Sequence, residues 1–268
     1  MITPQKHRGH EGCKPEAVAH RGASGYAPEN TLAAFRRVLE MGVPFIEVDV
    51  HMSRDGELVV IHDPKVDRTT NGKGAVGDLT LTQLKKLDAG SWFNLSHPGK
   101  ARMEFAGDRI PRLQEVIDLI KETKVGLYIE IKDPELYPQD FETRIISLLR
   151  RNEFEKKVVL LSFSANSLTK VRRLDSSIRT AFLASTSKTD PVSAAVSVGA
   201  DGLAIRHTLL TPKILREARH KKLGIAVWTV DDENAIRRAV NLGADRIISN
   251  YPDLVMRLLL EYRSWGLG

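Results

Sequence analysis

Residues 17–50 read AVAHRGASGYAPENTLAAFRRVLEMGVPFIEVDV, and the rest of the chain repeats the pattern of this stretch. Two short apolar runs, Ala17–His20 and Phe45–Val50, enclose the amphipathic segment Thr31–Met41. Gly42 follows that segment at the position where glycine commonly ends a helix. A strand, a helix and a second strand in this order are typical of a βα unit in a parallel sheet.

The same alternation continues almost to the C-terminus. Six more strands are predicted at Gly126–Ile131, Val158–Phe163, Thr180–Ala184, Gly202–Ile205, Ile225–Val230 and Arg246–Ser249. The predicted later helices are Leu113–Glu122, Phe141–Arg151, Ala165–Leu174, Val192–Val198, Pro212–Lys222, Asp232–Leu242 and one from Pro252, with Gly199, Gly224 and Gly243 as stops. Eight strands separated by helices predict an α/β protein with a (βα)₈ TIM barrel, a fold of about 250 residues. We therefore expect residues 1–268 to form a single domain.

A ninth apolar run, Leu58–His62, does not fit the parallel pattern. Only the turn-like residues 53–56 separate it from Phe45–Val50, and a parallel neighbour needs a much longer crossover. We expect an antiparallel hairpin arm that follows the second barrel strand and brings His62 back to the barrel mouth. The segment 64–109 lacks the βα alternation and is predicted to be a small insertion beside the active face.

Composition places the chain among soluble globular proteins, with 42% hydrophobic and 28% charged residues. The single cysteine, Cys13, cannot form an internal disulfide, the polar start resembles no signal peptide, and no apolar run approaches a transmembrane span. A cytoplasmic location is expected. The net charge is +6, but basic residues are interleaved with acids along the chain, so we expect no nucleic-acid partner. Weak association with an anionic membrane stays open, and the oligomeric state is not predicted.

Carboxylates interrupt two of the predicted strands. Glu47 and Asp49 alternate with aliphatic residues and therefore share one face, and Glu130 shares a face with Lys132. Acids on an inward barrel face need a cation, a proton or a basic partner. Oxygen ligands favour Mg²⁺ or Ca²⁺ over zinc, with Mn²⁺ as a further option. The alternative is an internal salt-bridge network with Lys132 and Arg21, which acids on two different strands make less favourable.

Histidines end two of the predicted strands. His20 and His62 would lie at the barrel mouth, where they suit general acid–base catalysis beside a metal. His51 is expected to face outward and is the weaker candidate. His7 and His10 lie near Cys13 in a loose metal-like spacing, but no strand or carboxylate pair accompanies them, so we discount this cluster.

Two cations near these groups indicate an anionic substrate. Arg21 offers a planar fork for phosphate oxygens, and Lys132 offers a compact charge. A divalent cation, two histidines and two basic side chains together are the equipment for phosphodiester cleavage.

At this point the sequence resembles the glycerophosphodiester phosphodiesterase family. The motifs that carry the resemblance are AHRGAS at 19–24, PENT at 28–31, EVDV at 47–50, DG at 55–56, VVIHD at 59–63, RTT at 68–70, IP at 110–111, EIK at 130–132, SF at 162–163, WTV at 228–230 and NYPD at 250–253. The match runs from about Ala17 to Pro252, and the order and spacing of the motifs make them jointly specific.

The resemblance implies a barrel of the phosphatidylinositol-phospholipase-C-like kind with a small inserted domain. It implies roles for ten residues: metal ligation by Glu47, Asp49 and Glu130, with Glu29 lining the site, acid–base catalysis by His20 and His62, phosphate contacts from Arg21 and Lys132, and a substrate pocket lined by Phe163 and Trp228. The expected reaction yields sn-glycerol 3-phosphate and an alcohol, either directly or after attack by a substrate hydroxyl to form a cyclic phosphate. Sequence does not assign which histidine is the base.

Two other functions stay open. A lysophospholipase D-type activity on lysophospholipids would suit the basic charge and the predicted insertion, which contains Trp92 and Phe93. The other alternative, from a different class, is a catalytically inactive phosphodiester-binding protein.

Overall fold

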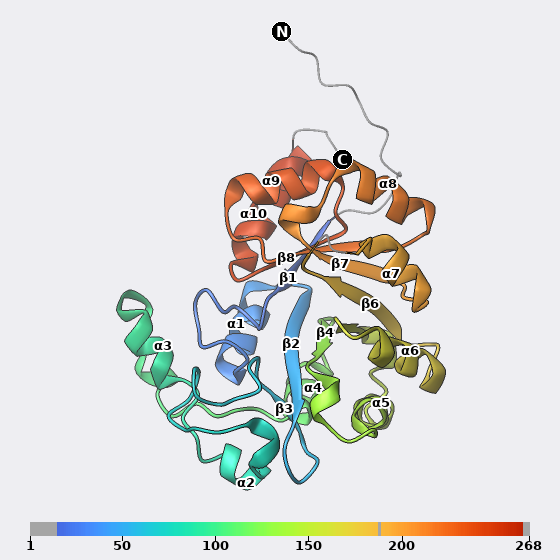
Figure 1. The fold of residues 1–268 in the computed structure, drawn as a ribbon. Helices are drawn as coiled ribbons and strands as arrows, with labels where there is room; N and C mark the ends of the chain where they lie inside the picture. Colours follow the sequence, from blue (N-terminus) through green and yellow to red (C-terminus); the bar gives the residue numbers. More distant parts are fainter. Residues whose placement is uncertain (1–14, 187–188, 265–268) are drawn as a thin grey trace.

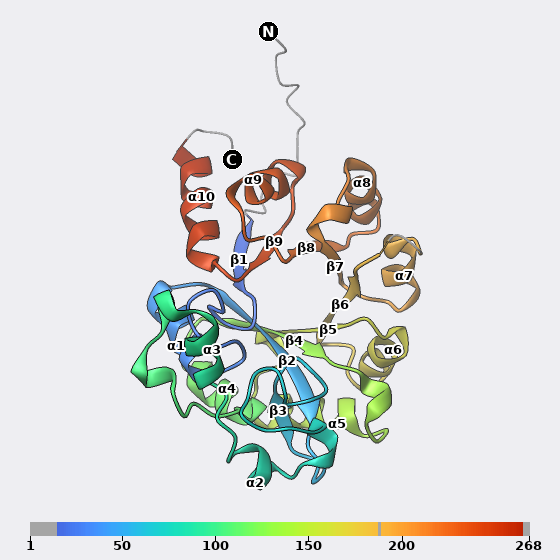
Figure 2. The same cartoon turned by 60° about the vertical axis from the view of Figure 1, so that its left-hand side comes forward.

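The computed structural model describes residues 15–186 and 189–264, in which eight parallel strands close into a barrel. The strands are β1 (Glu16–Ala19), β2 (Phe45–Met52), β4 (Gly126–Ile131), β5 (Val158–Ser162), β6 (Arg179–Ala184), β7 (Gly202–Arg206), β8 (Gly224–Trp228) and β9 (Arg246–Ser249). Each pairs with the next in chain order, and β1 pairs with both β2 and β9, which closes the ring (Figure 2). The predicted (βα)₈ barrel is confirmed.

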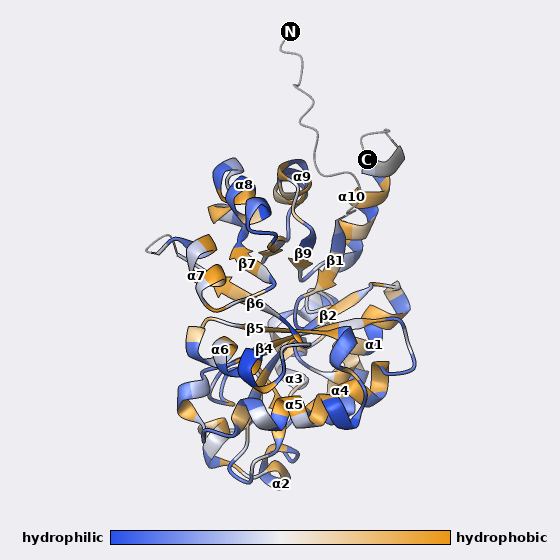
Figure 3. Cartoon of the chain, turned by 90° about the vertical axis from the view of Figure 1, so that its right-hand side faces the viewer, coloured by the Kyte–Doolittle hydropathy of each residue, from blue (hydrophilic) through white to orange (hydrophobic). Residues whose placement is uncertain are grey.

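Helices surround the ring and follow its strands. Their bounds are α1 (Leu32–Met41), α4 (Leu113–Ile120), α5 (Phe141–Arg151), α6 (Ala165–Leu174), α7 (Pro191–Ser197), α8 (Pro212–His220), α9 (Glu233–Leu242) and α10 (Pro252–Ser264). Short 3₁₀ turns occur at η4 (Pro134–Leu136), η5 (Glu155–Lys157) and η6 (His207–Leu209). Figure 3 shows hydrophobic strands in the centre and mixed colouring on the helices, as expected when each helix buries one stripe.

Local signals fix the helix ends in most cases. The Thr31 side chain accepts a hydrogen bond from the backbone N–H of Ala34 and caps α1, and Gly42 ends that helix in the left-handed conformation. Gly243 ends α9 in the same way. The prediction that Gly224 ends a helix was wrong, because Lys222 takes the left-handed conformation after α8 and Gly224 already begins β8.

Apolar residues form two layers that meet at the barrel wall. The larger layer lies between strands and helices and includes Ile46, Val48 and Val50 of β2. The smaller layer fills the barrel interior and includes Tyr128 of β4, with Phe45 packed against it edge to face. Inward positions therefore begin apolar at the amino ends of β2 and β4, and the acids come further along the same strands.

The predicted hairpin is confirmed. Strand β3 (Leu58–Val60) runs antiparallel to β2 and pairs Val60 with Val50. It ends two residues earlier than expected, so His62 lies beyond the strand, in the loop that follows. The chain then forms η1 (Val76–Asp78), α2 (Leu81–Leu84), α3 (Ser91–Ser96), η2 (Pro98–Lys100) and η3 (Met103–Phe105) before α4. Figure 1 shows α2 and α3 set apart from the ring of helices.

Two further sequence predictions concern the histidine and cysteine cluster near the N-terminus and the absence of a transmembrane span. His7, His10 and Cys13 lie outside the described residues. Among the residues that are described, no helix has the length and apolar character needed to cross a bilayer.

Candidate active site

Strand register brings the three predicted acids together. Glu47 and Asp49 stand two residues apart on β2, and Glu130 of β4 is the direct partner of Asp49 in the parallel ladder. One oxygen from each side chain lies within 4.8 Å of the other two. Glu47 and Asp49 are almost fully buried, and the Glu130 side chain is 12% exposed. The inner face of the barrel mouth therefore carries a compact carboxylate triad.

The triad is electrostatically unbalanced. Burial and the charges of Asp49 and Glu130 raise the pKa of Glu47 well above its ordinary value, and burial and the charge of Asp49 raise the pKa of Glu130 to about 7. Burial also opposes ionisation of Asp49, but Arg21 and Lys132 outweigh it and hold the pKa of Asp49 below its usual range. A hard divalent cation would relieve this repulsion, and three carboxylates suit its preference for oxygen. The residues therefore fit the predicted metal.

Arg21 and Lys132 answer only part of this negative charge. The Lys132 ammonium donates to Glu130 at 2.9 Å and lies 3.7 Å from Asp49. The Arg21 side chain lies 3.3 Å from Asp49 and donates to Glu29 at 2.8 Å. The salt-bridge network considered from the sequence is therefore present, yet two cations cannot balance three triad acids once all three are ionised.

The segment after β1 bends so that its backbone reaches the triad. Arg21 and Gly22 both have left-handed backbones, with φ of 54° and 82°. This turn aims the Arg21 N–H at Glu47, to which it donates at 2.9 Å. A Cβ on Gly22 would come within 2.7 Å of the Ala34 side chain on α1, so the close approach requires glycine.

Asn30 supports the triad and was not singled out from the sequence. Its side-chain amide donates to Asp49 Oδ2 at 2.8 Å, and its carbonyl oxygen accepts from the Asp49 backbone N–H at 3.3 Å. Asn30 is 3% exposed and has a left-handed backbone. Asn30 lies in the PENT motif at 28–31, but the motif gave no indication of a partner on β2.

His20 is held through a chain of polar contacts from β9. Its Nδ1 lies 2.8 Å from Asn250 Oδ1, and the Asn250 amide donates to Asp231 at 2.6 Å. Because the Asp231 carboxylate can only accept, the Asn250 oxygen faces His20, and Nδ1 carries the hydrogen. Partial burial and the Arg21 charge lower the pKa of His20 to about 4. His20 is therefore neutral near pH 7, with Nε2 able to accept a proton.

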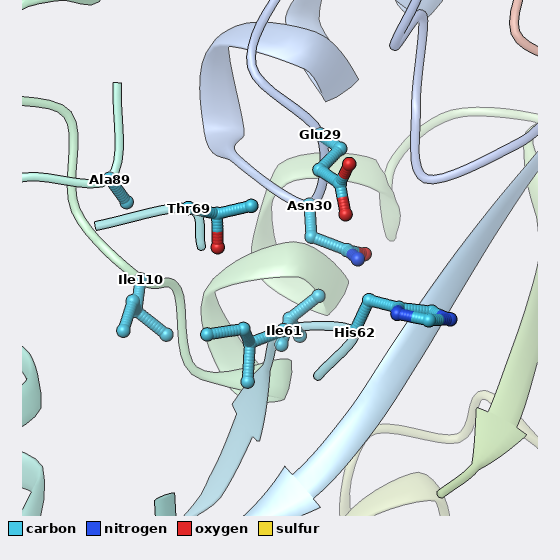
Figure 4. Close-up of a pocket in the computed structure, with 8 residues that line it drawn as sticks. Glu29, Asn30, Ile61, His62, Thr69, Ala89 and Ile110 are labelled. Carbon is cyan, nitrogen blue, oxygen red and sulfur yellow. The ribbon is translucent and has the colours of Figure 1, made fainter. Parts of the chain in front are cut away.

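His62 is held by a carboxylate instead. Its Nδ1 lies 2.6 Å from Asp63 Oδ1, and Arg68 donates to both Asp63 and Glu29. Burial lowers the pKa of His62, and the Arg68 hydrogen bonds lower the pKa of Asp63 to about 2. Glu29 thus lies at the rim, between Arg21 and Arg68. Figure 4 shows Asn30 and His62 among the residues that line a small cavity, together with Ile61, Thr69, Ala89 and Ile110.

The prediction that His51 faces outward was wrong. His51 stands two residues after Asp49 on β2, so strand alternation gives both the same face. Its side chain is fully buried, with Nε2 3.0 Å from the carbonyl oxygen of His62 and Nδ1 2.6 Å from the Tyr137 hydroxyl.

Phe163 and Trp228 also lie at the barrel mouth. Phe163 directly follows β5 and Trp228 ends β8, and the two rings meet edge to face with centroids 5.9 Å apart. Phe163 is 46% exposed, while the Trp228 indole donates to the Ala204 carbonyl at 3.0 Å. They form an aromatic pair at the carboxyl ends of β5 and β8, two strands that β6 and β7 separate in the ring.

A second cavity, of about 300 Å³, joins His20 and Arg21 to the segment containing α3 and η2. Lys100 lines it and donates to two uncharged acceptors, the Gly25 carbonyl at 2.7 Å and the Tyr251 hydroxyl at 3.2 Å. Neither acceptor carries a charge, so these bonds do not offset the positive charge of Lys100 beside the barrel mouth.

Comparison with known proteins agrees with this arrangement. The model of the glycerophosphoryl diester phosphodiesterase family matches residues 20–254. The chain is 38% identical to the glycerophosphodiester phosphodiesterase of Bacillus subtilis, over 91% of this chain and 86% of that protein. It is 36% identical to the enzyme of the same name from Caldanaerobacter subterraneus, over 92% and 98% of the two chains.

Solved structures give the same result. A glycerophosphodiester phosphodiesterase from Agrobacterium tumefaciens is 30% identical with a TM-score of 0.76, covering 90% of this chain and 98% of its own. An Oleispira antarctica phosphodiesterase in complex with the product sn-glycerol-3-phosphate is 28% identical with a TM-score of 0.83, covering 92% and 97%. The chain therefore belongs to the glycerophosphoryl diester phosphodiesterase family and is a phosphodiester-hydrolysing enzyme built on a (βα)₈ barrel.

Proposed function

We propose that the protein hydrolyses glycerophosphodiesters to sn-glycerol 3-phosphate and an alcohol, using a divalent cation and two histidines. The observation that carries the proposal is that His20 and His62 both feel the charge of Asp49 in the buried carboxylate triad, and that each has Nδ1 held by an acceptor. That arrangement leaves Nε2 of each ring free for proton transfer. The relative from Oleispira antarctica was solved with the product that this reaction would release.

The cation would be held by Glu47, Asp49 and Glu130. Repulsion among these carboxylates raises the pKa of Glu47 and of Glu130, and an added positive charge would relieve it. When bound, it would neutralise charge on the phosphate oxygens and so lower the barrier to attack at phosphorus. Mg²⁺, Ca²⁺ and Mn²⁺ are the candidates. Arg21 and Lys132 would contribute to the same neutralisation, because both border the triad.

The partners of the two histidines support different roles. Burial lowers the pKa of both rings, and the charged Asp63 carboxylate opposes this at His62, whereas the partner of His20 Nδ1 is the uncharged Asn250 amide and the pKa of His20 falls to about 4. We assign His20 as the base that accepts the proton of the attacking hydroxyl or water. His62 is then the acid that donates a proton to the leaving alcohol oxygen. Phe163 and Trp228 would pack against the glycerol carbons at the barrel mouth.

Release of glycerol 3-phosphate from a panel of glycerophosphodiesters, assayed with Mg²⁺, Ca²⁺, Mn²⁺ or excess EDTA, tests the proposal. We expect turnover with at least one cation and none in EDTA. Full activity in EDTA would remove the metal from the mechanism, and a His62→Ala variant with wild-type turnover would remove the histidine. Binding without turnover under all three cations would favour an inactive phosphodiester-binding protein.

Lysophospholipids are a second candidate substrate class. Leu95 and Met103 are 84% and 95% exposed in the segment between β3 and α4, the segment that also contributes Lys100 to the second cavity. Phe93, by contrast, is 1% exposed and packs with Ala27 and Phe105, so it offers no surface for an acyl chain. Comparing turnover of acylated and deacylated glycerophosphocholine separates the two substrate classes.

A further inference from the structure

His51 connects the carboxylate-bearing strand with the loop that carries His62. It is fully buried on β2 and pairs with Val59 of β3 in the hairpin ladder. That ladder ends at Val60, so the His62 carbonyl lies beyond the last strand pair. The Nε2 atom of His51, 3.0 Å away, takes the place of a strand partner for this carbonyl.

The hydrogen-bond partners define one tautomer of His51. A backbone carbonyl can only accept, so Nε2 of His51 must carry the hydrogen that points to His62. Nδ1 is then unprotonated and accepts from the Tyr137 hydroxyl at 2.6 Å. Burial lowers the pKa of His51, which is consistent with this neutral form. Tyr137 is itself packed against Phe141 of α5, with ring centroids 4.8 Å apart.

We propose that His51 and Tyr137 form a positioning pair that fixes the main chain of His62 so that its imidazole faces the leaving oxygen. The inference rests on the proposed acid role of His62. Two anchors then hold this residue, with Asp63 on the ring and His51 on the backbone. The neighbouring Ile61 N–H also donates to the Asp49 carbonyl at 3.0 Å, which ties the same loop to the triad strand.

A comparison of leaving groups tests this role. In a diester with an alkyl alcohol, the leaving oxygen needs a proton from the acid. In the p-nitrophenyl ester of glycerol 3-phosphate, p-nitrophenolate leaves without one. His51→Leu removes the donor to the His62 carbonyl. We expect kcat on glycerophosphocholine to fall roughly 10- to 100-fold, the loss typical of a small misplacement of a reacting group, with little change on the nitrophenyl ester. KM and Mg²⁺ affinity should stay within about threefold, because the triad is untouched.

Conservative variants keep the test valid if the leucine variant folds poorly. His51→Gln restores a side-chain N–H at the reach of Nε2, and we expect it to recover most of the lost kcat. Tyr137→Phe leaves His51 without its hydroxyl partner. It should shift the ratio of the kcat values on the two substrates in the same direction as His51→Leu, by a smaller factor. Val59→Ala is the matched control, because it weakens the same hairpin without touching the His62 carbonyl, and its two rates should fall together or not at all.

The outcomes separate the two proposals. If His62→Ala shows no dependence on the leaving group, the assignment of His62 as the acid is wrong. Suppose that His62→Ala shows that dependence, but that kcat of His51→Leu falls equally on both substrates or on neither. The positioning role of His51 is then refuted while the proposed function stands.

Discussion

Replacing Glu130 with glutamine is expected to stabilise the protein in EDTA while abolishing its activity. Burial and the charge of Asp49 raise the pKa of Glu130 from 4.5 to about 7. The folded protein therefore binds a proton more tightly than the unfolded chain does. The corresponding contribution to stability is present below pH 4.5 and is lost as the pH rises through 7. A shift of this size corresponds to a destabilisation of about 3 kcal/mol above pH 7.

Glutamine removes the ionisable group but keeps an acceptor for the Lys132 ammonium, which lies 2.9 Å from the glutamate oxygen. In EDTA at pH 8 we expect Glu130→Gln to be more stable than wild type by up to about 3 kcal/mol, or roughly 5–10 °C in Tm. At pH 5 the difference should be small. Mg²⁺ should stabilise wild type at pH 8 and have little effect on the variant, because binding to the folded state adds stability only where a site exists.

Urea unfolding at pH 5 and pH 8, with EDTA or Mg²⁺, measures these differences. Glu135→Gln is the matched control, since Glu135 is an exposed carboxylate five residues further along, and its substitution should change stability by less than about 0.5 kcal/mol. The reasoning is refuted if Glu130→Gln is no more stable than wild type at pH 8 in EDTA, or if its gain is the same at pH 5.

Three further predictions concern the neighbouring groups. Asp63→Asn should lower kcat on alkyl diesters roughly 10- to 100-fold, because it removes a charge-assisted hydrogen bond to His62. The control, Asp67→Asn on the same loop, should keep kcat within about twofold of wild type. Equal rates for both variants would contradict the role of Asp63. Mg²⁺ affinity should increase from pH 6 to pH 8 with proton release seen by calorimetry in two buffers, because raised-pKa carboxylates must lose protons to bind, and a pH-independent affinity would contradict this. Lys100→Met should lower kcat/KM for diesters with anionic alcohols by several fold relative to glycerophosphocholine, because the Lys100 charge faces the cavity beside His20. An unchanged ratio would mean that the alcohol group does not bind in this cavity.

The barrel and the triad were predictable because both follow from strand alternation. The period of two that buries Ile46 and Val48 against the helices turns Glu47 and Asp49 inward, and the equivalent pattern places Glu130. The same rule, applied one step further, gives His51 the face of Asp49, so the error about His51 contradicted the pattern that located the acids. The direction of His62 was not predictable in this way, because β3 ends at Val60 and alternation stops there.

The groups that support the site were less accessible to sequence reasoning. Asn250 lies 230 residues from His20, and only closure of the ring between β1 and β9 brings them within 2.8 Å. Asn30 lies 19 residues from Asp49, on a loop whose left-handed turn sets the direction of its amide. Motifs mark such residues as unusual, but the contacts depend on backbone geometry that no local pattern specifies.

The instability of the triad and its expected affinity for a cation have the same physical origin. Lower on the same strands, Phe45 and Tyr128 pack as an ordinary apolar interior, so the electrostatic cost is confined to the barrel mouth. There, Arg21 and Lys132 lower the electrostatic cost without cancelling it. Complete pairing would leave no net negative charge to attract a divalent ion. The repulsion among the three carboxylates that weakens the fold in EDTA is therefore the repulsion that a bound cation relieves, and a substitution that removes one should remove the other.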